Sequence, residues 1–541
     1  MSSLSLPVVV AIAQRGGSLG WAAAGACVVA AALGGVRWLR VAQREHYLPD
    51  SASRFTLRWW GTAPVNVFGV LVGLGGLVLA ARWTGAAFGS AGVVALGPFG
   101  LDLRGRTSPL VWTRRLRTLA AVWALLQAAI VVVGVLTGFA AVVCAAGALA
   151  VPAVVDLACV VTGPVERRLA YRHVKRATGR LARVKPKVVA ITGSYGKTST
   201  KRYVAHLLSG SMAVVASPAS FNNRAGLTRA VNEHLAEGTD VFVAEMGTYG
   251  PGEIAELCSW MTPDVAVITA IGPVHLERFG SEDEIVRAKS EIFDRAGCCV
   301  LSVDDSRLAD LAHACEAGGK RVWRVSGSVD VGSCAVAQPR ASAPAVEVSV
   351  VESPGGLSVR VRGEVLASDV SVAAHPGNLA CAVAVALELG VPAGEIAKRL
   401  RSLPVVAHRL EAQVAPGGFV VLDDTYNANP AGARAALAAL ERTAGDGGHR
   451  VVVTPGMVEL GRSQADENER FAAEVAICGA DLVVVGRTNR RALVSGYAPS
   501  SRAAASLVRV GRREQAVEWV RERLGPGDVV LYENDLPDHY P

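Results

Sequence analysis

The sequence predicts an α/β protein in which N-terminal transmembrane helices precede two domains built on parallel sheets. Apolar residues dominate about the first 165 positions, where acidic residues are few, and charges are mixed normally after them. In the remainder, apolar strand-like runs alternate with helical stretches in both halves, which is typical of parallel α/β domains. We therefore divide the chain into a transmembrane region at 1–165, a basic cytoplasmic linker at 166–186, a central P-loop domain at 187–406 and a Rossmann-like C-terminal domain at 407–541.

The first region predicts about five membrane-spanning helices. Each apolar stretch is near the ~17–25 residues that cross ~30 Å of hydrocarbon. Arginine-rich connections alternate with nearly uncharged ones, and the positive-inside rule places the basic ones in the cytoplasm. We expect a multi-pass protein of the cell (plasma) membrane, with the N-terminus outside and the later domains in the cytoplasm. The predicted spans are 18–36, 64–82, 85–102, 118–136 and 138–162.

The composition favours some binding partners of the protein over others. The net charge of +8 comes largely from arginines beside apolar segments, so the lipid bilayer explains it better than nucleic acid does. The cysteines have no zinc-binding spacing, which favours a reducing compartment. The first residues lack the basic start and cleavage site of a signal peptide. Asp156 lies in the last span and leaves two interpretations open, a functional intramembrane carboxylate or a helix-packing residue.

A phosphate-binding turn follows the first soluble strand. KVVAITG at 187–193 is a buried strand, and a helix is expected from about Thr198 to Leu208. Backbone N–H groups of such a turn and the positive end of such a helix bind phosphates. Lys197 can reach the terminal phosphates and the Thr198 hydroxyl can ligate Mg²⁺. Ile191 stands where the usual Walker pattern has glycine. The loop residues are Gly193, Ser194, Gly196, Lys197, Thr198 and Ser199.

Two more strands end in candidate ligands. DVFVAEMG at 240–247 places Glu245 at the carboxyl end of a strand, where it is a natural Mg²⁺ ligand. The next strand leads into a loop with His275, a second candidate for the metal or a phosphate. Lys289 follows on a helix, where a lysine is normally a solvated surface residue. The sequence predicts an antiparallel insertion at residues 324–374. It predicts a domain junction at residues 404–414.

Seven motifs in this order resemble the Mur ligases. The resemblance is closest to the branch that adds D-alanyl-D-alanine to UDP-N-acetylmuramoyl-tripeptide (MurF), and it covers about 187–530. The motifs are TGSYGKTST, FNNRAG, EMGTYGPGEI, ITAIGPVHLERFGS, RAKSEIF, DDTYNANP and GMVELG.

The resemblance implies an ATP-dependent ligase that forms an amide bond through an acyl-phosphate. It implies ATP, Mg²⁺ and a carbamylated Lys289, and a C-terminal domain that closes over ATP by hinge motion near 405–415. It assigns catalytic roles to Lys197, Lys289, His275 and Glu245. It assigns Mg²⁺ to Thr198, Glu245 and His275, the nucleotide to the loop with Asn378, Arg409 and Asp424, and the substrates to Asn222, Asn223, Asn427 and Asn429.

The chain also departs from the family pattern. His375 and Asn378 are one position closer than the family's adenine segment has them. The UDP-sugar-binding domain is replaced by the apolar region, and the chain has VLYENDLPDHYP where the family has a KGSR-type segment. We therefore expect a membrane-anchored ligase that joins a carboxylate of a cell-wall (peptidoglycan) precursor, or of another membrane-proximal substrate, to an amino acid or dipeptide.

Three alternatives stay open at this point. The first is a ligase of the poly-γ-glutamate type or of specialised metabolism. The second is a catalytically inactive membrane scaffold. The joint presence of five residues argues against it: Lys197, Thr198, Glu245, His275 and Lys289. The third is a P-loop-driven transporter, which is disfavoured because the spans show no paired repeats.

Overall fold

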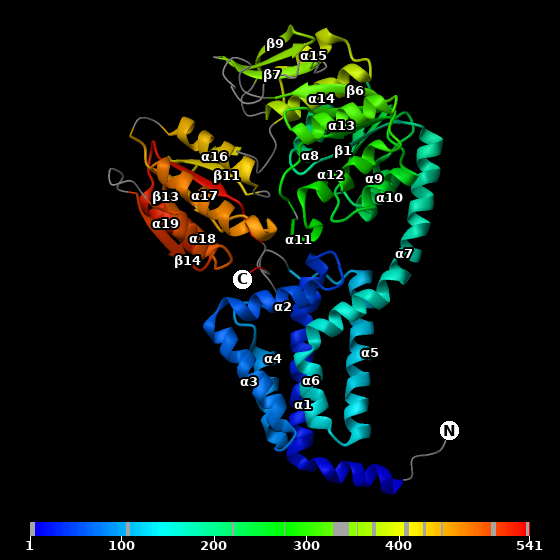
Figure 1. Cartoon of the computed structure of the whole chain (residues 1–541), viewed down its shortest axis with the longest axis vertical. Coiled ribbons are helices and arrows are strands. Elements are labelled where there is room, and N and C mark those ends of the chain that lie inside the picture. Colours follow the sequence, from blue (N-terminus) through cyan, green and yellow to red (C-terminus); the bar gives the residue numbers. More distant parts are fainter. Residues whose placement is uncertain are drawn as a thin grey trace. The chain divides into compact units, whose positions relative to one another are not determined.

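The computed structural model describes most of the chain (Figure 1). Contacts within the chain divide it into two compact units. The helical unit contains Met1–Leu169, Gly486–Thr488 and Asp535–Pro541, and the α/β unit contains Ala170–Val485 and Asn489–Asn534. The described residues are 6–103, 109–218, 221–274, 276–327, 346–353, 355–370, 375–404, 411–425, 429–444, 447–498, 505–536 and 540, with side chains described from residue 17 onward except those of Thr62 and Glu411.

Small side chains let the helices of the first unit pack closely. A Cβ on Gly34 would lie 3.1 Å from Val94, and one on Gly73 would lie 3.1 Å from Leu149. Glycine and alanine at helix contacts allow the helix backbones to approach closely. The helices are α1 (Leu6–Arg44), α2 (Ser51–Thr62), α3 (Pro64–Ala80), η1 (Thr84–Ala86), α4 (Ala87–Leu96), α5 (Arg114–Thr137), α6 (Ala140–Leu149) and α7 (Val151–Val184).

The prediction of five spans is corrected by these helices. Among the described residues, Gly17–Arg44 and Arg114–Thr137 are long and apolar enough to cross a membrane, and the number rises to at most four if each of two bent helix pairs counts as one span. The segment 85–102 fails because α4 ends before Gly97 and Pro98, and proline cannot continue a helix. The segment 138–162 is bent by 70° between α6 and α7. Pro152 lies in the first turn of α7, a position where proline starts a new helix readily.

Asp156 caps a helix inside this unit. Its carboxylate accepts hydrogen bonds from the backbone N–H groups of Ala52 (3.0 Å) and Ser53 (2.9 Å), in the first turn of α2. A helix start has unpaired N–H groups and a partial positive charge, and a carboxylate satisfies both. The packing interpretation of Asp156 therefore accounts for this carboxylate without a functional role.

The α/β unit begins with a nine-stranded sheet in the order β2-β3-β1-β4-β5-β6-β7-β8-β9. The pairs from β2 to β7 are parallel, and β7–β8 and β8–β9 are antiparallel. The predicted antiparallel insertion is therefore present in its described part. The strands are β1 (Lys187–Thr192), β2 (Val214–Ala216), β3 (Val241–Glu245), β4 (Val265–Ile268), β5 (Cys298–Ser302), β6 (Arg321–Ser326), β7 (Val348–Ser353), β8 (Gly356–Val361) and β9 (Glu364–Val370).

Both faces of this sheet are covered by helices. Val189 and Ile191 of β1 pack into one apolar cluster, whereas Val188 and Ala190 pack into another. Burial on both sides explains why these strands are continuous apolar runs. The helices are α8 (Lys197–Leu208), α9 (Arg224–His234), α10 (Glu253–Trp260), α11 (Leu276–Phe279), α12 (Glu282–Ser290), η2 (Glu291–Phe293), α13 (Ser306–Ala317), α14 (Pro376–Glu388) and α15 (Ala393–Leu400).

A second sheet of six strands follows, in the order β10-β11-β15-β12-β13-β14. Only the β10–β11 pair is antiparallel among these strands. The strands are β10 (Glu411–Val414), β11 (Val420–Asp424), β12 (Arg450–Thr454), β13 (Asp481–Val485), β14 (Leu507–Val510) and β15 (Val529–Glu533). The helices are α16 (Pro430–Thr443), η3 (Gly461–Ser463), α17 (Gln464–Ile477), α18 (Arg490–Gly496) and α19 (Arg513–Arg523). The predicted mixed α/β architecture is confirmed.

Candidate active site

The loop between β1 and α8 has the backbone of a phosphate cradle. Gly193 has φ +151° and Gly196, the N-cap of α8, has φ +77°, and side chains are strained in both conformations. A Cβ on Gly193 would lie 2.0 Å from the Thr269 hydroxyl, and one on Gly196 would lie 2.0 Å from Oδ1 of Asn378. Glycine is therefore required twice in this turn, once for space beside β4 and once beside α14.

Neighbouring loops hold the turn in place. The Ser194 N–H donates to the Ala270 carbonyl at 2.8 Å, and the Ser194 hydroxyl donates to the Gly272 carbonyl at 3.0 Å. The Thr269 hydroxyl donates to the Tyr195 carbonyl. The Lys197 ammonium bonds the Gly193 carbonyl at 2.7 Å, so this side chain folds back over the loop.

Glu245 meets the start of α8 from the neighbouring strand. It is the last residue of β3 and is paired with Ile191 in the parallel register with β1. Its Oε2 atom accepts a hydrogen bond from the Thr198 hydroxyl at 3.0 Å and lies 2.9 Å from the Lys201 ammonium. The side chains of Lys201 and Glu245 are only 5% and 4% exposed, so this is a buried ion pair.

Electrostatics keep Glu245 ionised in this buried position. Burial by itself raises the pKa of this carboxyl, but the charge and hydrogen bond of Lys201 oppose it, with help from Lys197 and Thr198. The net result is a pKa below the ordinary value. The carboxylate is therefore available as an anionic oxygen ligand at neutral pH.

Lys289 is buried and lacks a counter-ion among the described residues. It lies in the last turn of α12 and is 3% exposed. Burial, and then the nearby charge of Lys197, move its pKa well below the ordinary value for lysine. A lysine on a helix is normally solvated, but here α12 turns the side chain inward.

The predicted asparagines divide into two groups. Asn378 is 8% exposed in the first turn of α14 and touches the loop at Gly196. The Asn222 carbonyl accepts from the Gly247 N–H at 2.7 Å, just after β3. Asn223 and Asn429 instead cap helices: their Oδ1 atoms accept from N–H groups in the first turns of α9 and α16, at 3.0 and 2.8 Å. Those capping bonds give both a structural role, whatever else they bind.

Ser199 is buried in the first turn of α8, and Asp424 ends β11 opposite Glu533 of β15. The predicted site residues His275, Arg409 and Asn427 lie outside the described residues.

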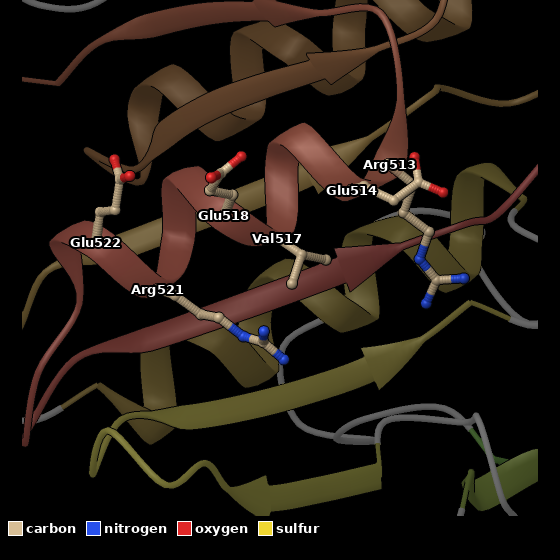
Figure 2. A pocket seen from close by; sticks show the side chains of 6 residues that line it. All are labelled: Arg513, Glu514, Val517, Glu518, Arg521 and Glu522. Atoms are coloured by element: carbon tan, nitrogen blue, oxygen red, sulfur yellow. The ribbon is translucent and has the colours of Figure 1, made fainter.

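One pocket adjoins this site. Its volume is about 560 Å³, and it runs along α8 from Thr198 and Lys201 towards His206. Its lining residues include Arg202 and no carboxylate. A second pocket, of about 630 Å³, lies along α19 and is lined by the six residues in Figure 2, none of which is a predicted site residue.

Lys201 is the site residue that the sequence analysis missed. The spacing from Lys197 could have indicated it: Lys201 lies one helical turn after Lys197, so both residues share a face of α8. Thr269 was also missed; the signal was its position directly after β4, at the same sheet edge as the loop.

The donor set fits Mg²⁺ bound together with a nucleotide. The Thr198 hydroxyl and the Glu245 carboxylate are oxygen ligands of the kind that Mg²⁺ prefers, and they converge. Among the described residues, no group of three or more His, Cys, Asp or Glu side chains forms a metal cage. Mg²⁺ commonly binds through one or two carboxylates plus substrate phosphates, so the arrangement is consistent with a metal carried by ATP.

Comparison with known proteins agrees with this geometry. The model of the Mur ligase middle domain matches residues 191–374, and that of the Mur ligase glutamate ligase domain matches residues 408–532. The UDP-N-acetylmuramoyl-tripeptide–D-alanyl-D-alanine ligase of Mycobacterium leprae is 34% identical over 368 residues, covering 64% of this chain and 70% of the relative.

Two solved structures are also similar. MurF from Acinetobacter baumannii has a TM-score of 0.53 at 25% identity, covering 68% of this chain and 77% of that one. MurF from Thermotoga maritima in complex with ADP has a TM-score of 0.54 at 24% identity, covering 68% and 80%. The second likeness concerns the fold alone.

Proposed function

The chain belongs to the Mur ligase family and is an ATP-dependent ligase; from this we propose that it joins a membrane-proximal carboxylate to an amino acid or dipeptide. One observation carries the proposal. The loop lysine Lys197, the Thr198–Glu245 pair and the buried Lys289 lie together, although they come from three separate segments of the chain.

The reaction has two bond-forming steps. A carboxylate oxygen of the donor attacks the γ-phosphorus of ATP, the bond to the β-phosphate oxygen breaks, and ADP leaves. The amine nitrogen then attacks the acyl carbon, phosphate leaves, and the nitrogen loses a proton. Positioning and charge neutralisation are most of what a protein provides for phosphoryl transfer. The loop N–H groups and Lys197 suit that task because they present positive charge to the phosphates.

We assign the remaining roles by family membership and position. Thr198, Glu245 and His275 would hold Mg²⁺, which neutralises phosphate charge when bound. Lys289 would be carbamylated, since a neutral amine reacts with CO₂ and the low pKa of Lys289 supplies that neutral form. Asn378, Arg409 and Asp424 would contact the nucleotide, and Asn222, Asn223, Asn427 and Asn429 the substrates.

The donor is proposed to be anionic and close to the membrane. The pocket beside Thr198 carries Lys201, Arg202 and His206 and no acidic lining residue, which suits a carboxylate- or phosphate-bearing donor. A peptidoglycan precursor that carries a carboxylate meets this description of the donor.

Membrane anchoring is part of the proposal. Apolar side chains on α5 are strongly exposed, including Leu125 at 70% and Leu136 at 55%. An exposed apolar helix of this length is stable in lipid and a liability in water. Two spans, or four, would place the N-terminus on the same side as the ligase domains, which we propose to be the cytoplasm. Carbonate extraction of membranes tests the anchoring, and protease access to an N-terminal tag tests the side.

The activity test uses the full chain purified in detergent with ATP and Mg²⁺. A panel of carboxylate donors, amino acids and dipeptides is scanned for phosphate release that requires both donor and amine. Lys197→Ala should abolish that release while leaving the fold intact. Nucleotide binding without turnover for any pair would favour an inactive scaffold, and normal turnover in Lys197→Ala would refute the loop assignment.

A further inference from the structure

A buried lysine shares one oxygen of the candidate metal ligand. Lys201 Nζ lies 2.9 Å from Oε2 of Glu245, and the Thr198 hydroxyl donates to that same atom at 3.0 Å. Lys201 extends from the second turn of α8, so the helix that presents the phosphate loop also brings this cation to the end of β3. Both side chains of the ion pair are withdrawn from solvent.

The ion pair between Lys201 and Glu245 determines the net charge of the protein at the candidate metal position. At about 3 Å in a poorly solvated position, the ammonium largely cancels the field of the carboxylate. No other His, Cys, Asp or Glu among the described residues completes a metal-binding group with Glu245. A free divalent cation would therefore encounter nearly neutral protein and would gain little by leaving water. The triphosphate of a bound nucleotide would supply the missing negative charge.

We propose that Lys201 makes divalent-metal binding at Glu245 conditional on the nucleotide, so that the metal binds only with nucleotide phosphates present. The ammonium also fixes Oε2 in place, leaving the other carboxylate oxygen for the incoming ion. This inference rests on the proposed function of the loop, but it concerns a residue outside the assigned catalytic set. It explains why a cation lies against the carboxylate that a metal would need.

The test is metal binding without turnover, in CO₂-free buffer so that Lys289 stays unmodified. Mn²⁺, a paramagnetic probe for the Mg²⁺ position, is titrated by electron paramagnetic resonance into the full chain in detergent, without nucleotide. Lys201→Gln keeps a hydrogen-bond donor near Glu245 and removes the charge. We expect the Lys201→Gln variant to bind free Mn²⁺ at least ten-fold more tightly than the chain without substitutions. The matched control, Lys201→Arg, should stay within about three-fold of the unmodified chain because it keeps the cation.

The gain in Mn²⁺ affinity that Lys201→Gln produces should also require the Glu245 carboxylate. The double variant Lys201→Gln/Glu245→Gln should return to weak binding. An unchanged Mn²⁺ affinity in Lys201→Gln, or a gain that persists in the double variant, would overturn the proposal.

A second measurement needs no variant at position 201. In the unmodified chain, a non-hydrolysable ATP analogue should raise the Mn²⁺ affinity at least 100-fold. Tight Mn²⁺ binding without nucleotide that is lost in Glu245→Gln would contradict the inference directly. The analogue failing to bind at all would instead refute the proposed function of the loop, while the nucleotide-free titrations would still decide the role of Lys201.

Discussion

The Thr198 hydroxyl donates a hydrogen bond of 3.0 Å to the Glu245 carboxylate, although 47 positions separate the two residues. Parallel pairing of β1 with β3 brings them together, because both strands end at the same edge of the sheet. We propose this hydroxyl and carboxylate as a pair of oxygen ligands for Mg²⁺, and their position beside the loop between β1 and α8 makes them the first target for mutation.

Removing either oxygen should impair catalysis more than nucleotide binding. We expect Thr198→Ala and Glu245→Gln to lower kcat by about 100-fold or more, since each weakens the neutralisation of phosphate charge. Steady-state rates at a series of Mg²⁺ concentrations measure the effect. Thr198→Ser keeps the hydroxyl and should remain within a few-fold of the unmodified enzyme. A serine variant as slow as the alanine variant would mean that the hydroxyl is not what matters.

The loop should not accept a side chain at position 196. Gly196→Ala combines a left-handed backbone, which costs a residue with a Cβ about 1–2 kcal/mol, with a contact of 2.0 Å to Asn378. We expect at least a ten-fold loss of ADP affinity by isothermal titration calorimetry. Gly394→Ala is the matched control, because this glycine lies in the first turn of α15 and a Cβ added there would meet nothing within 4 Å. The control should bind ADP normally and should keep or slightly raise thermal stability.

Lys289 should behave as a modified residue and not as a cation. Burial lowers its pKa and so favours the neutral amine, which is the form that combines with CO₂. Lys289→Ala should lose most activity and recover part of it when acetate or formate is added, since a small carboxylate replaces the carbamate. Lys289→Arg is charged at all pH values and should show no such recovery. Equal recovery in both variants, or none in either, would count against the carbamate.

Glu533 should make the stability of the C-terminal domain fall as the pH rises from about 4.5 to about 8. Its carboxyl is fully buried at the end of β15 and accepts a hydrogen bond from the Thr454 hydroxyl at 2.9 Å. Burial raises its pKa to about 8, against 4.5 as the ordinary value. The stabilisation of the neutral form is therefore complete below about pH 4.5 and is lost as the pH rises through about 8.

Glu533→Gln should make the stability of the C-terminal domain less dependent on pH. The amide cannot ionise, so the free energy of unfolding at pH 9 should exceed that of the unmodified chain, by an amount on the order of a few kcal/mol. Denaturant titrations at pH 6 and pH 9 would show it. Parallel losses of stability in both proteins between these values would place the responsible titration at another group.

Asp156 should contribute to stability and not to catalysis. Asp156→Ala removes the acceptor of two N–H groups at the start of α2 and should lower stability in detergent by about 1 kcal/mol. Asp156→Asn keeps an oxygen acceptor and should lose less. Thermal denaturation in detergent measures both, and a large fall in kcat without a fall in stability would revive the functional interpretation.

Local patterns in the sequence determined much of this protein. The glycine-rich turn after β1 and the position of Glu245 at a strand end were predictable, because glycine-rich turns and buried apolar runs are local signals. The mixed α/β fold and the ligase class followed from motifs in a fixed order. The caps by Asn223 and Asn429 were also within reach, since an asparagine before a helix is a common N-cap.

Only the tertiary structure decided the rest, for a shared physical reason. The inward turn of Lys289, the ion pair of Lys201 with Glu245 and the cap by Asp156 each depend on which surfaces pack together, and hydropathy along the chain does not encode that. For the same reason, fewer described helices qualify as candidate spans than the five that the sequence predicted. Apolar length predicts where a helix can cross a bilayer, but backbone breaks at Gly97, Pro98 and Ala150 decide where it stays straight.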